Sequence, residues 1–202
     1  MRSVIAAGST RAGVRPGIIG DMRLGIADHL GWAVAVTVSA DHEVVDRRRI
    51  ELIEPGLTTA PLHYESQRLD VAATAALVAK VRASVVRTTS AALDEIASVL
   101  PEPVVSISLR TWPLDFPEDI AVQRRVPYEA RADAIMYRQV LAELAHARDW
   151  DVHLYNAKEV VGQAVSMLAE RADEVLQGPR ATMGPPWTKD HRVAVAATIV
   201  GG

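Results

Sequence analysis

The stretch MRLGIADHLGWAVAVTVSADHEVVDRRRIELI, residues 22–53, contains three short apolar runs separated by turns. The runs cover residues 22–27, 32–38 and 44–53. Because turns of about four residues can only join antiparallel neighbours, the stretch predicts a three-stranded meander. Asp28 stands where the first strand meets its turn. A rigid strand holds a carboxylate there within reach of water or substrate, so this residue is a candidate for function.

The rest of the chain alternates helical and extended patterns. Over residues 66–100 apolar residues recur at spacings of three and four residues, which predicts an amphipathic helix. The cluster Thr88-Thr89-Ser90 is expected to interrupt it, with Ser90 capping a second short helix. Further elements are expected in this order: strand 104–109, helix 128–150, strand 152–155, a helix from Asn156 and a helix from Thr188. The predicted fold class is therefore α/β: the antiparallel meander plus two further strands form a mixed sheet, with helices on both faces.

Length and composition suit one domain. The chain has 202 residues, of which 49% are hydrophobic, so it can build a sizeable core. We expect residues 1–20 to be a flexible tail, or a translation start placed too early, and residues 21–202 to be the domain. The net charge of -3 gives no indication that the protein binds nucleic acid or an acidic membrane, although a local basic patch can still bind DNA.

Cysteine is absent, which excludes disulfides, thiolate metal sites and cysteine nucleophiles, and fits a cytoplasmic location. No apolar run reaches the ~18–20 residues that a membrane helix needs, so no membrane partner is expected.

Two Asp-His pairs are the first candidate site: Asp28-His29 after the first strand, and Asp190-His191 at the start of the last helix. Carboxylate and imidazole ligands could hold Mg²⁺ or Mn²⁺. Two such ions roughly 3.5–4 Å apart can activate water and hold the leaving oxygen in phosphodiester cleavage. The alternative is structural: Asp190 would offset the helix dipole, and Asp28 would serve the turn.

Arginines form a second candidate, a nucleic-acid-binding surface. In the third predicted strand, alternation sends Arg47 and Arg49 to one face and Arg48 to the other. The surface would also use Arg124 and Arg125, with Arg131, Arg138 and the loop residues Trp112 and Trp187 as further contributors. The alternative is an ordinary solvated face, because Asp46, Glu51, Glu129 and Asp133 lie among these arginines.

The chain resembles the ribonuclease H-like superfamily, most closely RuvC-type Holliday-junction resolvases, over about residues 22–200. The resemblance rests on RLGIAD (23–28) leading through LGWAV (30–34), on VHLYNAKEV (152–160), and on DHRVAVAA (190–197). The resemblance implies metal-dependent cleavage of phosphodiester bonds at a site with four acidic or histidine ligands. Asp28 matches the first ligand, and the last helix normally carries others at its start.

The implied ligand set is depleted in this sequence. The fourth strand should supply a glutamate, and residues 104–110 contain no acid. His191 takes the place of an aspartate, Asp190 sits beside it, and Thr188 stands where another ligand would be. Such a site should hold Mg²⁺ poorly, because ligand charge offsets the cost of dehydrating that ion.

Two functions follow from the resemblance. One is a nuclease that acts on structured DNA or RNA, with Asp28, Asp190 and His191 positioning a metal and activating water. The alternative is a non-catalytic nucleic-acid-binding or scaffold protein that keeps the fold. A third reading, a phosphate-handling relative of the actin and sugar-kinase branch, lacks a Gly-rich loop near Asp28. Because resolvases are symmetric dimers, the resemblance also implies a homodimer.

Overall fold

A five-stranded mixed sheet is the centre of the computed structural model, which describes residues 20–201. Its strands are β1 (Met22–Asp28), β2 (Trp32–Val38), β3 (Val44–Glu51), β4 (Val104–Arg110) and β5 (Asp151–Tyr155), in the order β3-β2-β1-β4-β5. The meander β1–β3 is antiparallel, whereas β1, β4 and β5 run parallel to one another. The predicted sheet is therefore confirmed. Residues 1–19 of the predicted tail lie outside the described residues.

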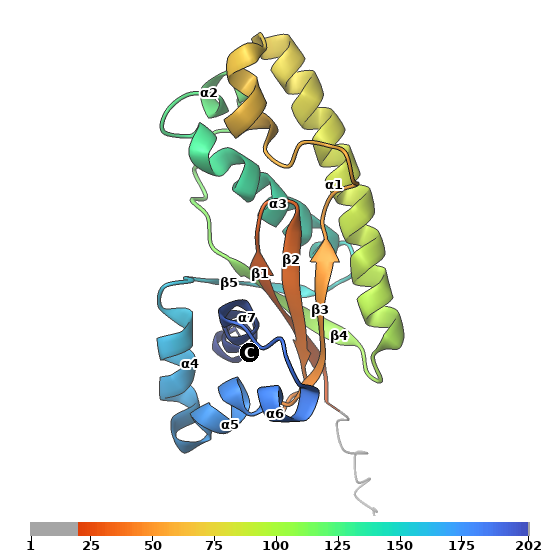
Figure 1. Ribbon diagram of the computed structural model, residues 1–202, viewed down its shortest axis with the longest axis vertical. Coiled ribbons are helices and arrows are strands. Elements are labelled where there is room, and N and C mark those ends of the chain that lie inside the picture. The colour runs from red at the N-terminus through yellow and green to blue at the C-terminus, as the bar shows by residue number, and fades with distance from the viewer. Residues whose placement is uncertain (1–19, 202) are drawn as a thin grey trace, which may run out of the picture.

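Helices cover both faces of the sheet (Figure 1). One face carries α1 (Val71–Val99), α2 (Ile120–Gln123), α3 (Glu129–His146) and the short helical turns η1 (Pro61–Glu65) and η2 (Ser66–Arg68). The other carries α4 (Val160–Leu168), η3 (Ala169–Arg171), α5 (Ala172–Gln177), α6 (Pro179–Met183) and α7 (Lys189–Val200). The predicted layers are thus confirmed. Within residues 20–201, no helix has both the length and the apolar character to cross a membrane.

Side-chain alternation divides the core into two clusters and decides which way Asp28 points. Leu24 and Ile26 of β1 pack with α1 and α3, whereas Ala27 packs with α7. Successive side chains of a strand point to opposite faces, so Asp28 shares the face of Ile26. The carboxylate at the end of β1 therefore points toward α3.

The last helix lies directly on β1 because Gly25 has no side chain. A Cβ atom at this position would lie 1.9 Å from the carbonyl oxygen of Ala194. With this close approach α7 is buried along most of its length, at His191, Val193, Ala194, Val195, Ala196, Ala197, Thr198 and Ile199. The helix is therefore an inner wall of the domain and not a peripheral attachment.

The predicted interruption at Thr88-Thr89-Ser90 is wrong, because α1 runs unbroken through these residues. The Thr89 hydroxyl donates to the Leu52 carbonyl at 3.5 Å, and the Ser90 hydroxyl accepts from Arg148 at 2.8 Å. The hydroxyls thus bond to neighbouring elements instead of to the helix's own backbone. The buried residues Val85 and Leu93 continue the apolar stripe across the cluster, so packing overrides the local preference.

Candidate active site

Asp28 ends β1 as a buried carboxylate in contact with two arginines. Its side chain is only 3% exposed. Arg138 donates from Nε to Oδ2 at 2.8 Å, while the Nε of Arg110 lies 3.8 Å from Oδ1. The first contact is a charge-assisted hydrogen bond, and the second is an ion pair too long to be one. A single negative charge is therefore shared between two guanidinium groups.

The fold brings these arginines to Asp28 from separate elements. Arg110 is the last residue of β4, which pairs with β1. Arg138 reaches across from α3, where its side chain is 11% exposed, and it also donates to the Thr111 carbonyl at 3.4 Å. On β5, Tyr155 donates from its hydroxyl to the Ile26 carbonyl at 2.7 Å. We call Asp28, Arg110, Arg138 and Tyr155 the carboxylate–arginine cluster.

The titration of Tyr155 agrees with a structural role in this cluster. Burial, reinforced by the negative charge of Asp28, raises the pKa of its hydroxyl. The proton therefore stays on the oxygen at neutral pH and remains available to the Ile26 carbonyl. This bond ties the end of β5 to β1 across the intervening strand β4.

The cluster does not fit Mg²⁺ or Mn²⁺. The guanidinium of Arg138 already donates a hydrogen bond to Oδ2 of Asp28, and the guanidinium of Arg110 lies near Oδ1. A divalent cation bound to Asp28 would therefore lie close to two positive charges. Like charges at such separations repel strongly in a buried site. Across residues 20–201, no group of three or more histidines, aspartates or glutamates could hold a metal ion. The depleted ligand set seen in the sequence is therefore not completed by residues from elsewhere in the described chain.

Asp190, in the first turn of α7, belongs to a separate arrangement. Its Oδ2 lies 3.0 Å from Nε2 of His29. The His29 ring stacks on Trp32 with centroids 4.0 Å apart, and the guanidinium carbon of Arg49 lies 4.1 Å from the same Trp32 ring. Two groups at this distance must occupy opposite faces of the ring. Neither face of Trp32 is therefore open for stacking against a base.

His191 serves as the capping partner of α7. Its Nδ1 accepts a hydrogen bond from the Thr188 backbone N–H at 3.1 Å and lies 2.8 Å from the Thr188 hydroxyl oxygen. Burial, followed by the positive charge of Arg47, lowers the pKa of this imidazole, while Asp190 acts weakly in the other direction. A neutral ring with an unprotonated Nδ1 is what the cap requires.

The three predicted catalytic residues thus have different partners. Asp28 pairs with arginines, Asp190 pairs with His29, and His191 pairs with Thr188. They do not form a metal-type group among the described residues. Their catalytic role stays a prediction.

The four arginines predicted to contact nucleic acid also differ in their surroundings. Arg47 donates to the carbonyls of Met183 and Pro186, and Arg124 to those of Ser66 and Leu69, so both hold backbone segments in place. Arg49 pairs with Glu51 at 2.8 Å in addition to covering Trp32. Arg125 is exposed and has no carboxylate within 4.0 Å in the described part of the chain. Asp133, expected on a solvated face, is buried and accepts from the backbone N–H groups of Leu62 and His63.

Sequence reasoning missed the arginines of the carboxylate–arginine cluster. It assigned Arg138 to the nucleic-acid-binding surface and gave Arg110 no role. The signal was present, because the strand that should carry a glutamate ends instead in Arg110. A positive residue at the expected place of a ligand indicates that the neighbouring carboxylate is neutralised by the protein itself.

The sheet order β3-β2-β1-β4-β5, with its antiparallel meander and parallel β1, β4 and β5, gives the chain a ribonuclease H-like fold. Structures of RuvC from Thermus thermophilus are similar to it. The structure titled "T. thermophilus RuvC in complex with Holliday junction substrate" has a TM-score of 0.46 and 12% identity, covering 89% of this chain and 90% of that chain. The "Thermus thermophilus RuvC structure" has a TM-score of 0.45 and 11% identity, covering 88% and 91%. No protein-family model and no curated protein matches the sequence.

Proposed function

We propose that this protein is a non-catalytic ribonuclease H-like protein that binds structured DNA or RNA without cutting it. The observation that carries the proposal is the ion pair between Asp28 and Arg138, with Arg110 beside it. In this arrangement the protein supplies the positive charge that a metal ion would otherwise bring to the carboxylate. The site then keeps its electrostatic balance without a divalent cation, and it lacks the means to activate water by metal coordination.

Exposed arginines support the binding part of the proposal. Arg125, after α2, and Arg131, in the first turn of α3, are exposed and form no ion pair with the described residues. Exposed arginines can contact the phosphate groups of DNA or RNA. Such contacts dominate nucleic-acid affinity and need no particular base sequence. A protein with a net charge of -3 would depend on such a local surface and not on its overall field.

A second candidate is metal-dependent phosphodiester hydrolysis with Asp28, Asp190 and His191 and with Mg²⁺ or Mn²⁺. The observation in its favour is that Oδ1 of Asp28 is buried and accepts no hydrogen bond from the described residues. For this function both arginines would have to leave the carboxylate.

A homodimer is a further part of the prediction, and sedimentation equilibrium over a range of protein concentrations tests it.

The test measures binding and cutting on the same labelled substrates: a four-way junction, a flap and an RNA–DNA hybrid. We expect binding that weakens as salt is raised, because phosphate contacts release counterions, and no cutting in Mg²⁺ or Mn²⁺. Arg125→Gln and Arg131→Gln should each weaken binding. Arg180→Gln is the matched control, since Arg180 is an exposed arginine on α6, at the opposite end of the molecule from α2 (Figure 1).

Two outcomes would overturn the proposal in different ways. Metal-dependent cutting that is lost in Asp28→Asn would replace it with the hydrolase. Absence of binding to all three substrates would remove the nucleic-acid part and leave a scaffold with another partner.

A further inference from the structure

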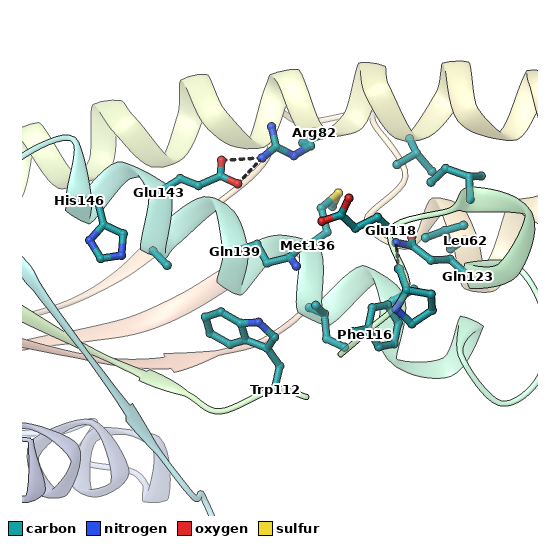
Figure 2. A pocket seen from close by; sticks show the side chains of 16 residues that line it. Leu62, Arg82, Trp112, Phe116, Glu118, Gln123, Met136, Gln139, Glu143 and His146 are labelled. Atoms are coloured by element: carbon teal, nitrogen blue, oxygen red, sulfur yellow. Dashed lines mark hydrogen bonds and ion pairs between the residues drawn. The ribbon is translucent and has the colours of Figure 1, made fainter. Parts of the chain in front are cut away.

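A cavity of about 450 Å³ opens between α1, α3 and the segment that joins β4 to α2 (Figure 2). Leu62, Val78, Ile135 and Met136 contribute apolar surface, and polar side chains from α1, α3 and the connecting segment join them. The volume lies within the ~300–1,000 Å³ of small-molecule sites, and an apolar lining with a few polar groups is their usual composition. The cavity neighbours the carboxylate–arginine cluster, since Arg138 donates to the residue before Trp112.

Trp112 is the feature that indicates a flat ligand. It is half-buried, it lines the cavity, and in Figure 2 its side chain lies below that of Gln139. Trp32, Trp150 and Trp187 each have a guanidinium over the ring. In the described chain Trp112 alone has neither a guanidinium nor an aromatic ring stacked on it. Trp112 also packs partly against the core, so the part of its ring that lines the cavity is what a planar group could contact.

The polar lining indicates which edge such a ligand should present. Gln139 offers an amide donor and an acceptor, and its side chain forms no hydrogen bond within residues 20–201. Arg82 donates to both carboxylate oxygens of Glu143, at 2.6 and 2.5 Å, so these two charges cancel. Glu118 then leaves the lining with an excess negative charge. The cavity is suited to hydrogen-bond donors and disfavours a phosphate.

We propose that this cavity binds a neutral, planar heterocycle with an exocyclic amino group, the chemistry shared by adenine, cytosine and guanine. The ring stacks on Trp112 while its polar edge faces Gln139 and Glu118. Glutamine pairs with adenine in this manner elsewhere, and unpaired bases commonly stack on aromatic side chains. The base could come from a free nucleoside or from an unpaired position in a nucleic acid. This site goes beyond the proposed function and does not depend on it.

Calorimetric titration of the full chain with adenosine, uridine and AMP tests the chemistry. Adenosine should bind, with uridine about tenfold weaker because it lacks the amino donor. AMP should also bind more weakly than adenosine, because its phosphate faces an acidic lining. No heat with adenosine, cytidine or guanosine at about 1 mM would overturn the proposal, and so would tighter binding of AMP than of adenosine.

Variants locate the site. Trp112→Leu should weaken adenosine binding by about 5- to 150-fold, which corresponds to the ~1–3 kcal/mol of one base stacked on an aromatic side chain, whereas Trp112→Phe should retain most of it. Gln139→Glu, which removes the amide donors and adds a second negative charge beside Glu118, should change the selectivity among nucleosides. Gln163→Glu is the matched control, because Gln163 is an exposed glutamine on α4 outside the cavity. Equal binding in the Trp112→Leu, Gln139→Glu and wild-type proteins would place the ligand elsewhere and overturn the proposal.

A competition experiment separates the two sources of the base. An oligonucleotide with one unpaired adenine is compared with the same oligonucleotide carrying an abasic position. Displacement of adenosine by the first and not by the second would assign an unpaired base. Equal displacement by both, or by neither, would leave a free nucleoside as the ligand and would not affect the proposed function, which the cutting and salt-dependent binding assays measure.

Discussion

Replacing Asp28 by asparagine should destabilise the protein, and the direction of this change separates a structural ion pair from a metal site. The Asp28 and Arg138 side chains are 3% and 11% exposed, and their polar atoms lie 2.8 Å apart. Removing one partner of a buried pair leaves an uncompensated charge and costs about 3–5 kcal/mol. In Asp28→Asn, moreover, the guanidiniums of Arg110 and Arg138 would face each other without a counterion. For a chain of this size, about 3 kcal/mol lowers the Tm by roughly 6–12 °C.

A double-mutant cycle isolates the interaction. Asp28→Asn, Arg138→Met and the double variant are unfolded with urea in the presence of EDTA, and midpoints are followed by circular dichroism. Each single variant should lose stability, and the double variant should lose clearly less than the sum of both. Asp94→Asn is the matched control: Asp94 also pairs with an arginine, Arg148, but its side chain is 65% exposed, so the expected loss is below about 1 kcal/mol.

The opposite sign would refute the reasoning. In a metal site without its metal, a carboxylate is held close to other carboxylates, and its neutralisation relieves repulsion. A stabilising or neutral Asp28→Asn, or a coupling energy near zero between Asp28 and Arg138, would therefore show that the ion pair does not hold the carboxylate in solution.

Three further predictions concern the rest of the domain. Gly25→Ala should cost about 3 kcal/mol or more, because its Cβ would lie 1.9 Å from the Ala194 carbonyl oxygen, whereas Gly162→Ala in open space on α4 should stabilise by up to about 1 kcal/mol; calorimetric Tm values check both. The pKa of His191 is lowered from 6.5 in the folded protein, so as pH falls the imidazole is protonated first in the unfolded state. The contribution of His191 to the free energy of unfolding is therefore present above about pH 6.5 and is lost as pH falls below that value. Urea midpoints measured against pH should show this loss, and a slope unchanged in His191→Gln would contradict it. Millimolar Mn²⁺ should leave the Tm unchanged, whereas an upward shift abolished by Asp28→Asn would contradict the metal-free site.

The sheet could be predicted because its signals are local. The second strand of the meander, residues 32–38, has the predicted bounds, and β1 is one residue longer than expected. Turn residues and β-branched runs decide such strands within a few positions of the chain. By contrast, the continuity of α1 depends on partners such as Leu52 and Arg148, which are distant in sequence, so the local hydroxyl cluster at residues 88–90 gave the wrong interpretation.

The candidate site could be predicted only in part, for the same reason. Strand alternation gives the face on which Asp28 lies, but it does not say which helix covers that face. Arg138 is 110 residues away along the chain, and its position on α3 identifies it as a partner only once the helix is docked. Arg124 likewise appeared to be a surface cation, whereas it donates to the carbonyl of Ser66, the first residue of η2, and to that of Leu69, just after η2.

The placement of α7 as an inner wall has a consequence for synthesis on the ribosome. The meander emerges early, yet the face that carries Ala27, Val34 and Val36 stays uncovered until residues near 199 have been made. A nascent chain therefore carries a partly uncovered apolar sheet face until α7, which lies far behind β2 in the sequence, has been made. Such a chain is exposed to aggregation and to chaperone capture until α7 docks. A stop codon that removed this single short helix would take Val193, Ala194, Val195, Ala196, Ala197 and Ile199 out of the second core cluster.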